Sequence, residues 1–213
     1  MQKIVGQSTP HVDLLKTYYG ITPRQEPLTK AARSNSSYLH NLYLERKILV
    51  AREQAPLAYA KIEAVLALLT DTIGITNHGF NLHIIEDYFP NAFIVNGSGD
   101  IYVTTEMLKK EELTKGELAS ILSHELGHYL KSFLNVNISS KAEPLLYKAA
   151  FAWTARARCQ FNEFDSDEIG LILMDMAGFS VDESLSMAGK ISRKKTISGT
   201  KAKFLDPFNS HPD

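Results

Sequence analysis

Cysteine is nearly absent from this sequence, which has one such residue, Cys159, in 213 positions. A disulfide bond within one chain needs two cysteines, so disulfide bonds cannot hold this fold together. The sequence is therefore not that of a disulfide-stabilised secreted scaffold. A chain in which 44% of the residues are hydrophobic is instead long enough to be stabilised by a buried core.

Long hydrophobic runs are also missing. The longest, AVLALL at residues 64–69, is far shorter than the roughly 20 residues that a membrane-spanning helix needs. The N-terminus, MQKIVGQSTPHVDLL, lacks the apolar segment of a signal peptide. As written, the sequence predicts a cytoplasmic protein without a transmembrane helix. If a leader had been removed, the alternative is an exported or periplasmic protein.

The sequence has no excess of charge of either sign. Lys and Arg number 23, Asp and Glu number 24, and the formal net charge is −1. This balance gives no reason to expect a nucleic acid or an anionic membrane surface as partner. The length favours one compact domain, residues 51–213, preceded by an N-terminal helical extension, residues 1–50. The sequence does not indicate an oligomeric state.

The periodicity of the chain changes twice. From Ser36 to Leu69 the apolar residues recur at helical spacing, and Pro56 is expected to divide this stretch into two helices. Residues 81–87, 92–96 and 100–107 are rich in β-branched and aromatic residues and are separated by turn residues. They predict a small antiparallel sheet of about three strands.

Helical patterns return after the predicted strands. Thr114 and Glu117 have the spacing of a capping box, which predicts a helix that runs to about Leu134. A second long helix is expected over residues 143–177 and a short one over residues 182–188. The fold class is therefore α+β, mostly helical with one small sheet.

The first of these helices contains the motif HELGH. His124 and His128 lie about 40° apart on a helical wheel, so both imidazoles can reach one metal ion. Glu125 is displaced sideways by about 100°, which suits a base that acts on metal-bound water. The alternative is an ordinary amphipathic helix with two core histidines that bond to backbone carbonyls.

A catalytic zinc ion needs three protein ligands and one open position. A third histidine on the same helix is excluded, because Lys131 and Leu134 occupy the places of the Gly and His that would complete HExxHxxGxxH. The stretch NEFDSDE offers Glu163 as a ligand instead. Asp167 follows one turn later, where it can accept a hydrogen bond from a ligating imidazole. The alternative for these acidic residues is a solvated helix face.

HELGH followed by this acidic stretch resembles the gluzincin metallopeptidases. The segment NAFIVNGSGDIYVTTEML, residues 91–108, resembles the strand that precedes HExxH in HtpX-like and CaaX-prenyl-protease-like zinc endopeptidases. The sequence Ser210-His211-Pro212 follows in the order of that family, and the resemblance extends over about residues 77–213. Without transmembrane helices, the chain resembles a soluble, compact member of that family, similar to the minigluzincins or to the catalytic domains of secreted relatives.

The resemblance implies a zincin-type catalytic domain, with the small sheet along the edge of the active-site cleft. One Zn²⁺ ion per chain would be bound by His124, His128 and Glu163. Glu125 would be the general base and acid, and Asp167 would orient a ligating histidine.

The resemblance also implies how substrate would bind. Asn91 and His211 match positions near the cleft that help to stabilise the oxyanion. The strand around Asp100–Thr105 would be the sheet edge that pairs with an extended protein or peptide substrate.

These features together predict a zinc-dependent endopeptidase, in which zinc-bound water attacks the peptide bond with the help of Glu125. One alternative is a latent or inactive zinc-binding or chaperone-like module, in which His211 is a fourth ligand that closes the site. Another is a metal-free helical interaction protein.

Overall fold

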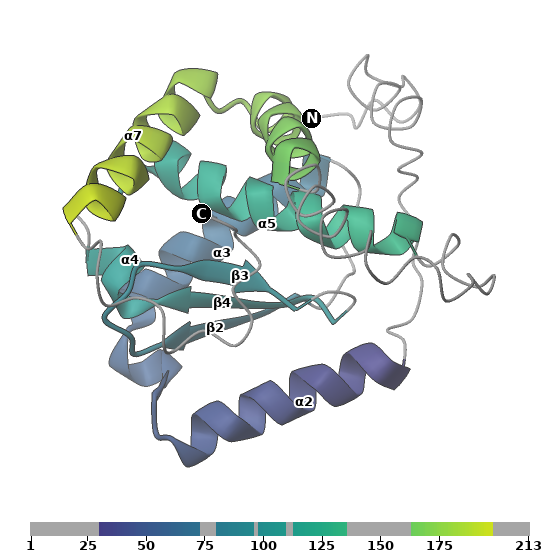
Figure 1. Cartoon of the computed structure of the whole chain (residues 1–213), viewed down its shortest axis with the longest axis vertical. Coiled ribbons are helices and arrows are strands. Elements are labelled where there is room, and N and C mark those ends of the chain that lie inside the picture. Colours follow the sequence, from purple (N-terminus) through teal and green to yellow (C-terminus); the bar gives the residue numbers. More distant parts are fainter. Residues whose placement is uncertain (1–29, 73–79, 96–97, 110–112, 136–162, 198–213) are drawn as a thin grey trace, which may run out of the picture.

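The computed structural model describes residues 30–72, 80–95, 98–109, 113–135 and 163–197. It confirms the predicted α+β class, because helices surround one small sheet (Figure 1). The described helices are α2 (Lys30–Glu45), α3 (Pro56–Thr72), α4 (Thr105–Lys109), α5 (Lys115–Asn135), the segment 163–176 and α7 (Val181–Ile197), with a short 3-10 turn, η1 (Arg52–Gln54). The strands are β1 (Leu49–Val50), β2 (Asn81–Ile85), β3 (Ala92–Ile94) and β4 (Asp100–Thr104).

The sheet differs from the prediction, because it has four strands and is mixed. Its order is β1-β2-β4-β3, with β2 and β4 parallel and the other neighbours antiparallel. After β2 the chain does not form the neighbouring strand next. It first forms β3 at the far edge of the sheet and then returns as β4, which lies between β2 and β3. A strand pattern alone does not show such a crossover, and β1 is too short to stand out in the sequence.

The position of β4 corrects a second prediction. We expected the strand around Asp100–Thr105 to be the sheet edge that binds substrate. However, β4 is hydrogen-bonded to β2 on one side and to β3 on the other, and all five of its residues are buried. The edge strand that packs against α5 is β3.

The helix predictions are confirmed in part. Pro56 is the first residue of α3, where its missing N–H is not needed, but α2 already ends at Glu45, and β1 and η1 lie between the two helices. α4 takes the place of the end of the third predicted strand. α7 is longer than the predicted helix over residues 182–188. The predicted helix over residues 143–177 is described only from residue 163 onward.

The predicted capping box at the start of α5 is present. The Thr114 backbone N–H donates to Glu117 Oε2 over 3.0 Å, and the Glu117 N–H donates to Thr114 Oγ1 over 3.1 Å. The carboxylate of Glu117 is buried and also accepts hydrogen bonds from Ser186 and Lys190 of α7, each over 2.8 Å. The cap therefore fixes α7 against the start of α5.

The core lies between the sheet and the helices α3 and α5. Alternate strand residues contribute to it: Leu82, Ile84, Ala92, Ile94, Ile101 and Val103. On the opposite sheet face, His83 and Tyr102 contact the rings of His40 and Tyr43 of α2. Phe93 stacks on Tyr102 on the same face. In the described part of the chain, no helix is long and apolar enough to span a membrane.

Candidate metal centre

Two glycines bring α5 and the helical segment 163–176 into backbone contact. A Cβ atom added to Gly127 would lie 2.6 Å from the carbonyl oxygen and 2.9 Å from the Cα of Ser166. In the other direction, a Cβ atom on Gly170 would lie 3.0 Å from the backbone nitrogen of His124. Only a residue without a Cβ atom allows this approach without displacing backbone. The two helices therefore come close enough for short side chains to meet.

Three potential ligands meet at this contact. Atoms of His124, His128 and Glu163 all lie within 4.8 Å of one another. The two Nε2 atoms are 3.0 Å apart, and the Glu163 carboxylate oxygens lie 3.4 Å from Nε2 of His124 and 3.5 Å from Nε2 of His128. Ligands of a tetrahedral zinc ion with bonds of about 2.0–2.1 Å are separated by roughly 3.4 Å. The three side chains therefore fit a zinc ion in both chemistry and spacing.

The other nitrogen of each imidazole also has a partner. His124 Nδ1 lies 2.7 Å from Asp167 Oδ1, which is the pairing proposed for Asp167 on sequence grounds. His128 Nδ1 lies 2.9 Å from Ser166 Oγ. Sequence reasoning missed Ser166, although it follows Glu163 by three residues and so shares its helix face. Hydrogen bonds at Nδ1 thus orient both rings so that their Nε2 atoms point toward each other and toward Glu163.

The environment of His124 changes the acidity of its imidazole. Burial disfavours the charged ring, but hydrogen bonds with Asp167 and Glu163 and the charge of Glu125 outweigh burial. Together they raise the pKa of His124 to about 10. An array of carboxylates that stabilises a proton on the ring also suits a cation, so the site is electrostatically prepared for a metal ion.

Glu125 lies between α5 and the edge strand β3. Its side chain is 4% exposed, and its Oε2 accepts a hydrogen bond of 3.1 Å from the backbone N–H of Ile94. Ile94 belongs to β3, and its N–H points away from the partner strand β4, toward α5. We refer to His124, His128 and Glu163 as the metal group. The carboxylate of Glu125 is thus held by the outer edge of the sheet.

A comparison with known protein families shows which family the chain belongs to. The family model described as Peptidase family M48 matches residues 56–199, which is more than half of the chain. The chain belongs to peptidase family M48. M48 peptidases are zinc-dependent metallopeptidases, so the predicted metallopeptidase class is confirmed for the family. No curated protein matches the chain.

The M48 match includes the elements that build the metal group. The matched residues run from the start of α3 into the residues that follow α7 and contain β3, α5 and the helical segment 163–176. All three grouped ligands and Glu125 therefore lie inside the family region. Among the described residues, the group of His124, His128 and Glu163 is the one suited to hold a metal ion.

Of two further residues predicted from the resemblance, the structure describes Asn91 and does not describe His211. Asn91 immediately precedes β3, where its N–H donates to Thr104 Oγ1 over 2.9 Å and its carbonyl accepts from the Thr104 N–H over 2.9 Å. These bonds fix the backbone at the start of the edge strand. His211 lies outside the described residues, and its role stays a prediction.

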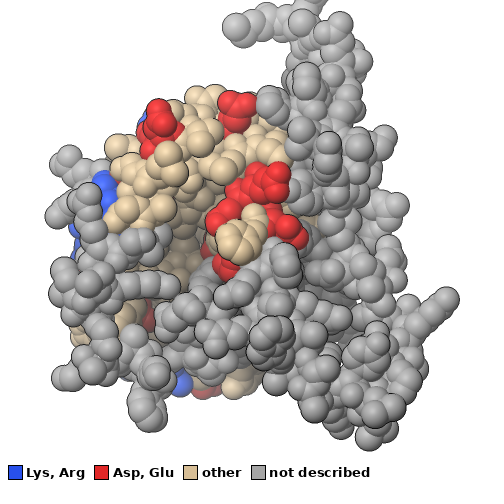
Figure 2. Space-filling model, turned by 45° about the horizontal axis from the view of Figure 1, so that its top comes forward, with Lys and Arg blue, Asp and Glu red and all other residues tan. Residues whose placement is uncertain are grey.

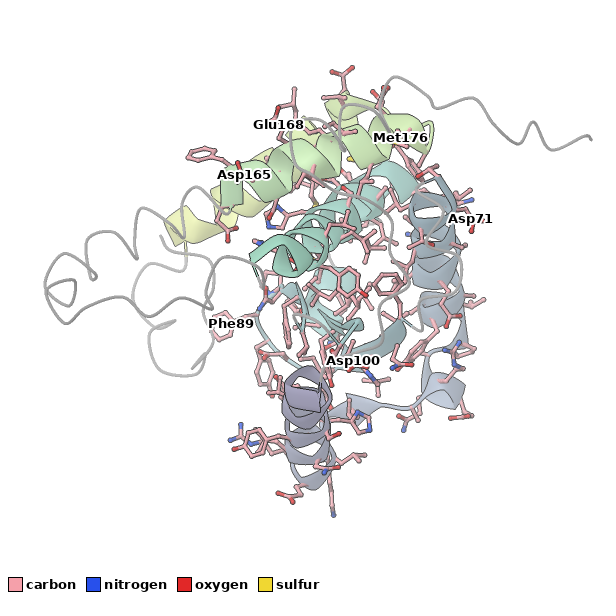
Figure 3. The ribbon with its side chains drawn as sticks, turned by 90° about the vertical axis from the view of Figure 1, so that its right-hand side faces the viewer. Asp71, Phe89, Asp100, Asp165, Glu168 and Met176 are labelled. Carbon is pink, nitrogen blue, oxygen red and sulfur yellow. The ribbon has the colours of Figure 1, made fainter. Side chains whose placement is uncertain are left out.

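The surface beside the metal group is acidic. Figure 2 shows Asp and Glu side chains gathered in one patch on the face that it presents. On the helical segment 163–176, Asp167 and Glu168 are exposed and Asp165 is half-buried. Figure 3 shows Glu168 on the side of this helix that faces away from α5. Such a surface raises the local concentration of cations near the site.

Proposed function

We propose that this M48 family member is a zinc-dependent endopeptidase with one Zn²⁺ ion per chain. His124, His128 and Glu163 would hold the ion, and Asp167 would orient His124. The observation that best supports this proposal is the convergence of two imidazoles and one carboxylate at separations of 3.0–3.5 Å. Zinc at this place would supply Lewis-acid chemistry to a water molecule and to the scissile carbonyl.

Glu125 is proposed as the general base and acid. It is the residue after His124 on α5 and lies next to the metal group without being one of its three members. In this role it accepts a proton from the attacking water and later donates a proton to the leaving amine. The hydrogen bond from the Ile94 N–H holds one carboxylate oxygen, which restricts the direction of the other.

The proposed substrate is a protein or peptide in an extended conformation. The outer edge of β3 is not paired with another strand in the described sheet, and its Ile94 N–H lies directly at Glu125. A peptide added along this edge would form main-chain hydrogen bonds with β3 and present its backbone to the metal group. Asn91 at the start of β3, and His211, are proposed to help stabilise the oxyanion.

Membership in a metallopeptidase family favours the enzyme over a latent zinc-binding module. The latent alternative needs a fourth protein ligand. The residue predicted for that role, His211, lies outside the described residues.

The substitution Glu125→Gln tests the proposed function. Gln keeps the size of the side chain and an oxygen that can accept from Ile94, but it cannot take up a proton. We expect a loss of about 100- to 10,000-fold in the rate of casein cleavage. Zinc content should be unchanged, and Glu168→Gln, on the surface of the neighbouring helix, should cleave like wild type. Undiminished cleavage by Glu125→Gln would contradict the proposal.

A further inference from the structure

We propose that Ser166 is a positioning residue that directs His128 toward the metal ion. The inference rests on the proposed function, because it concerns how a ligand of that zinc ion is held. Ser166 lies on the same helix as Glu163 and Asp167, and its side chain is fully buried. Its hydroxyl group therefore lies in the protein interior, where water does not compete for its hydrogen bonds.

The two nitrogens of the His128 ring have different partners. Nδ1 lies 2.9 Å from Ser166 Oγ, and Nε2 lies 3.0 Å from Nε2 of His124. Because the two nitrogens point to opposite sides of the ring, the contact at Nδ1 sets the direction of Nε2. A flipped ring would lose both contacts.

The chemistry of a metal ligand determines which way the hydrogen bond runs. Nε2 must be unprotonated to bind a cation, so Nδ1 of His128 keeps the proton and donates it to the Ser166 hydroxyl oxygen. Such an outer bond fixes the tautomer and makes the ligating nitrogen more basic.

The partner of His128 is neutral, whereas the partner of His124 is the carboxylate of Asp167. The centre already contains the carboxylates of Glu125 and Glu163. A hydroxyl group orients the second ring without adding another negative charge to this cluster.

Only a short side chain could make this contact. Gly127 of α5 lies against the backbone of Ser166, with its Cβ position 2.9 Å from Ser166 Cα. At this helix separation, a hydroxyl on a single methylene group reaches the ring of His128, one residue along α5. The contact between Ser166 and His128 therefore depends on the close helix approach that Gly127 allows.

The test is the Zn²⁺ affinity of the metal-free protein, measured by competition with a chromogenic chelator. Ser166→Ala should weaken Zn²⁺ binding about 10- to 100-fold. Ser123→Ala is the matched control, because Ser123 is also buried and its hydroxyl donates to the carbonyl of Ser120 in its own helix. Its affinity should stay within about twofold of wild type.

A second readout separates positioning from packing. In the zinc-loaded protein, the Nδ1 proton of His128 should give a slowly exchanging NMR resonance that is lost in Ser166→Ala. If Ser166→Ala unfolds, the zinc-loaded wild-type protein decides: a slowly exchanging Nδ1 proton on His128 supports the inference, and a His128 ring without a proton at Nδ1 overturns it.

The inference and the proposed function fail in different ways. A wild-type protein that binds Zn²⁺, together with a folded Ser166→Ala variant of equal affinity, overturns the inference and leaves the proposed function intact. A wild-type protein that does not bind Zn²⁺ overturns both.

Discussion

The residues of the metal group differ in how visible they are in the sequence. His124, Glu125 and His128 stand in one recognisable motif, and Glu163 and Asp167 share a helix face at a spacing of one turn. Sequence spacing could therefore predict which side chains meet. Ser166 could not be selected in the same way, because its contact with His128 depends on how closely two helices approach, which is a property of the fold.

The raised pKa of His124 leads to a prediction about metal uptake. With a pKa of about 10, the ring carries a proton in the metal-free protein at pH 7–9, and a metal ion at Nε2 must displace it. Acid therefore opposes binding. We expect His124 to release about one proton per zinc ion at pH 8, and the apparent affinity to rise about tenfold per pH unit from pH 7 to pH 9.

Calorimetric titrations of Zn²⁺ in buffers of different ionisation enthalpy count the released protons. Asp167→Asn removes the carboxylate whose hydrogen bond raises the pKa of His124, so this variant should release fewer protons at pH 8. A wild-type protein that takes up zinc without proton release would show that His124 is neutral before binding.

At the scale of elements, the glycine contact between α5 and the helical segment 163–176 sets the geometry of the site. Gly127→Ala would place a Cβ atom 2.6 Å from the Ser166 carbonyl oxygen, and backbone cannot yield as a side chain can. The helices must then separate. We expect a loss of about 1–3 kcal/mol in the free energy of unfolding of the metal-free protein and weaker Zn²⁺ binding.

Gly189→Ala is the control for this prediction. Gly189 lies inside α7, and among the described residues no heavy atom outside its own helix backbone lies within 4 Å of its Cβ position, so alanine there should be neutral or stabilising by up to about 1 kcal/mol. Urea unfolding and zinc titration of both variants make the comparison. If Gly127→Ala matched wild type in both measurements, the helices would not depend on the glycine contact.

Elements that depend on neighbouring residues were the most predictable. The capping box of α5 and the start of α3 at Pro56 are local, and both are confirmed. Strand pairing joins residues far apart in the chain, as in the parallel register of Asn81 with Asp100. The strands were therefore located from the sequence, but their order was not, and the edge strand was assigned to β4 instead of β3.

At the scale of the whole molecule, the question is where the catalytic unit begins. The division into an extension, residues 1–50, and a catalytic domain, residues 51–213, stays a prediction. In the structure, β1 pairs with β2, and α2 contributes Tyr43, whose ring meets that of Tyr102 edge-on at 5.3 Å. These contacts indicate that α2 stabilises the sheet from the face opposite α5.

We therefore expect Tyr43→Ala to destabilise the whole protein by about 1–2 kcal/mol, because it removes an aromatic contact with a fully buried strand residue. Tyr38→Ala is the matched control on the same helix, since Tyr38 is 65% exposed. Thermal unfolding should show a lower Tm for Tyr43→Ala alone. Equal Tm values for both variants would indicate that α2 is an independent extension.

The zinc content of purified Glu163→Ala tests the central claim most directly, because Glu163 joins the second helix to the HELGH motif. Elemental analysis should find about one zinc ion per chain in wild type and in the control Glu168→Ala, whose acidic side chain is exposed. Glu163→Ala should retain much less zinc. Stoichiometric zinc in Glu163→Ala, or its absence from wild type, would contradict the claim that His124, His128 and Glu163 form the zinc site.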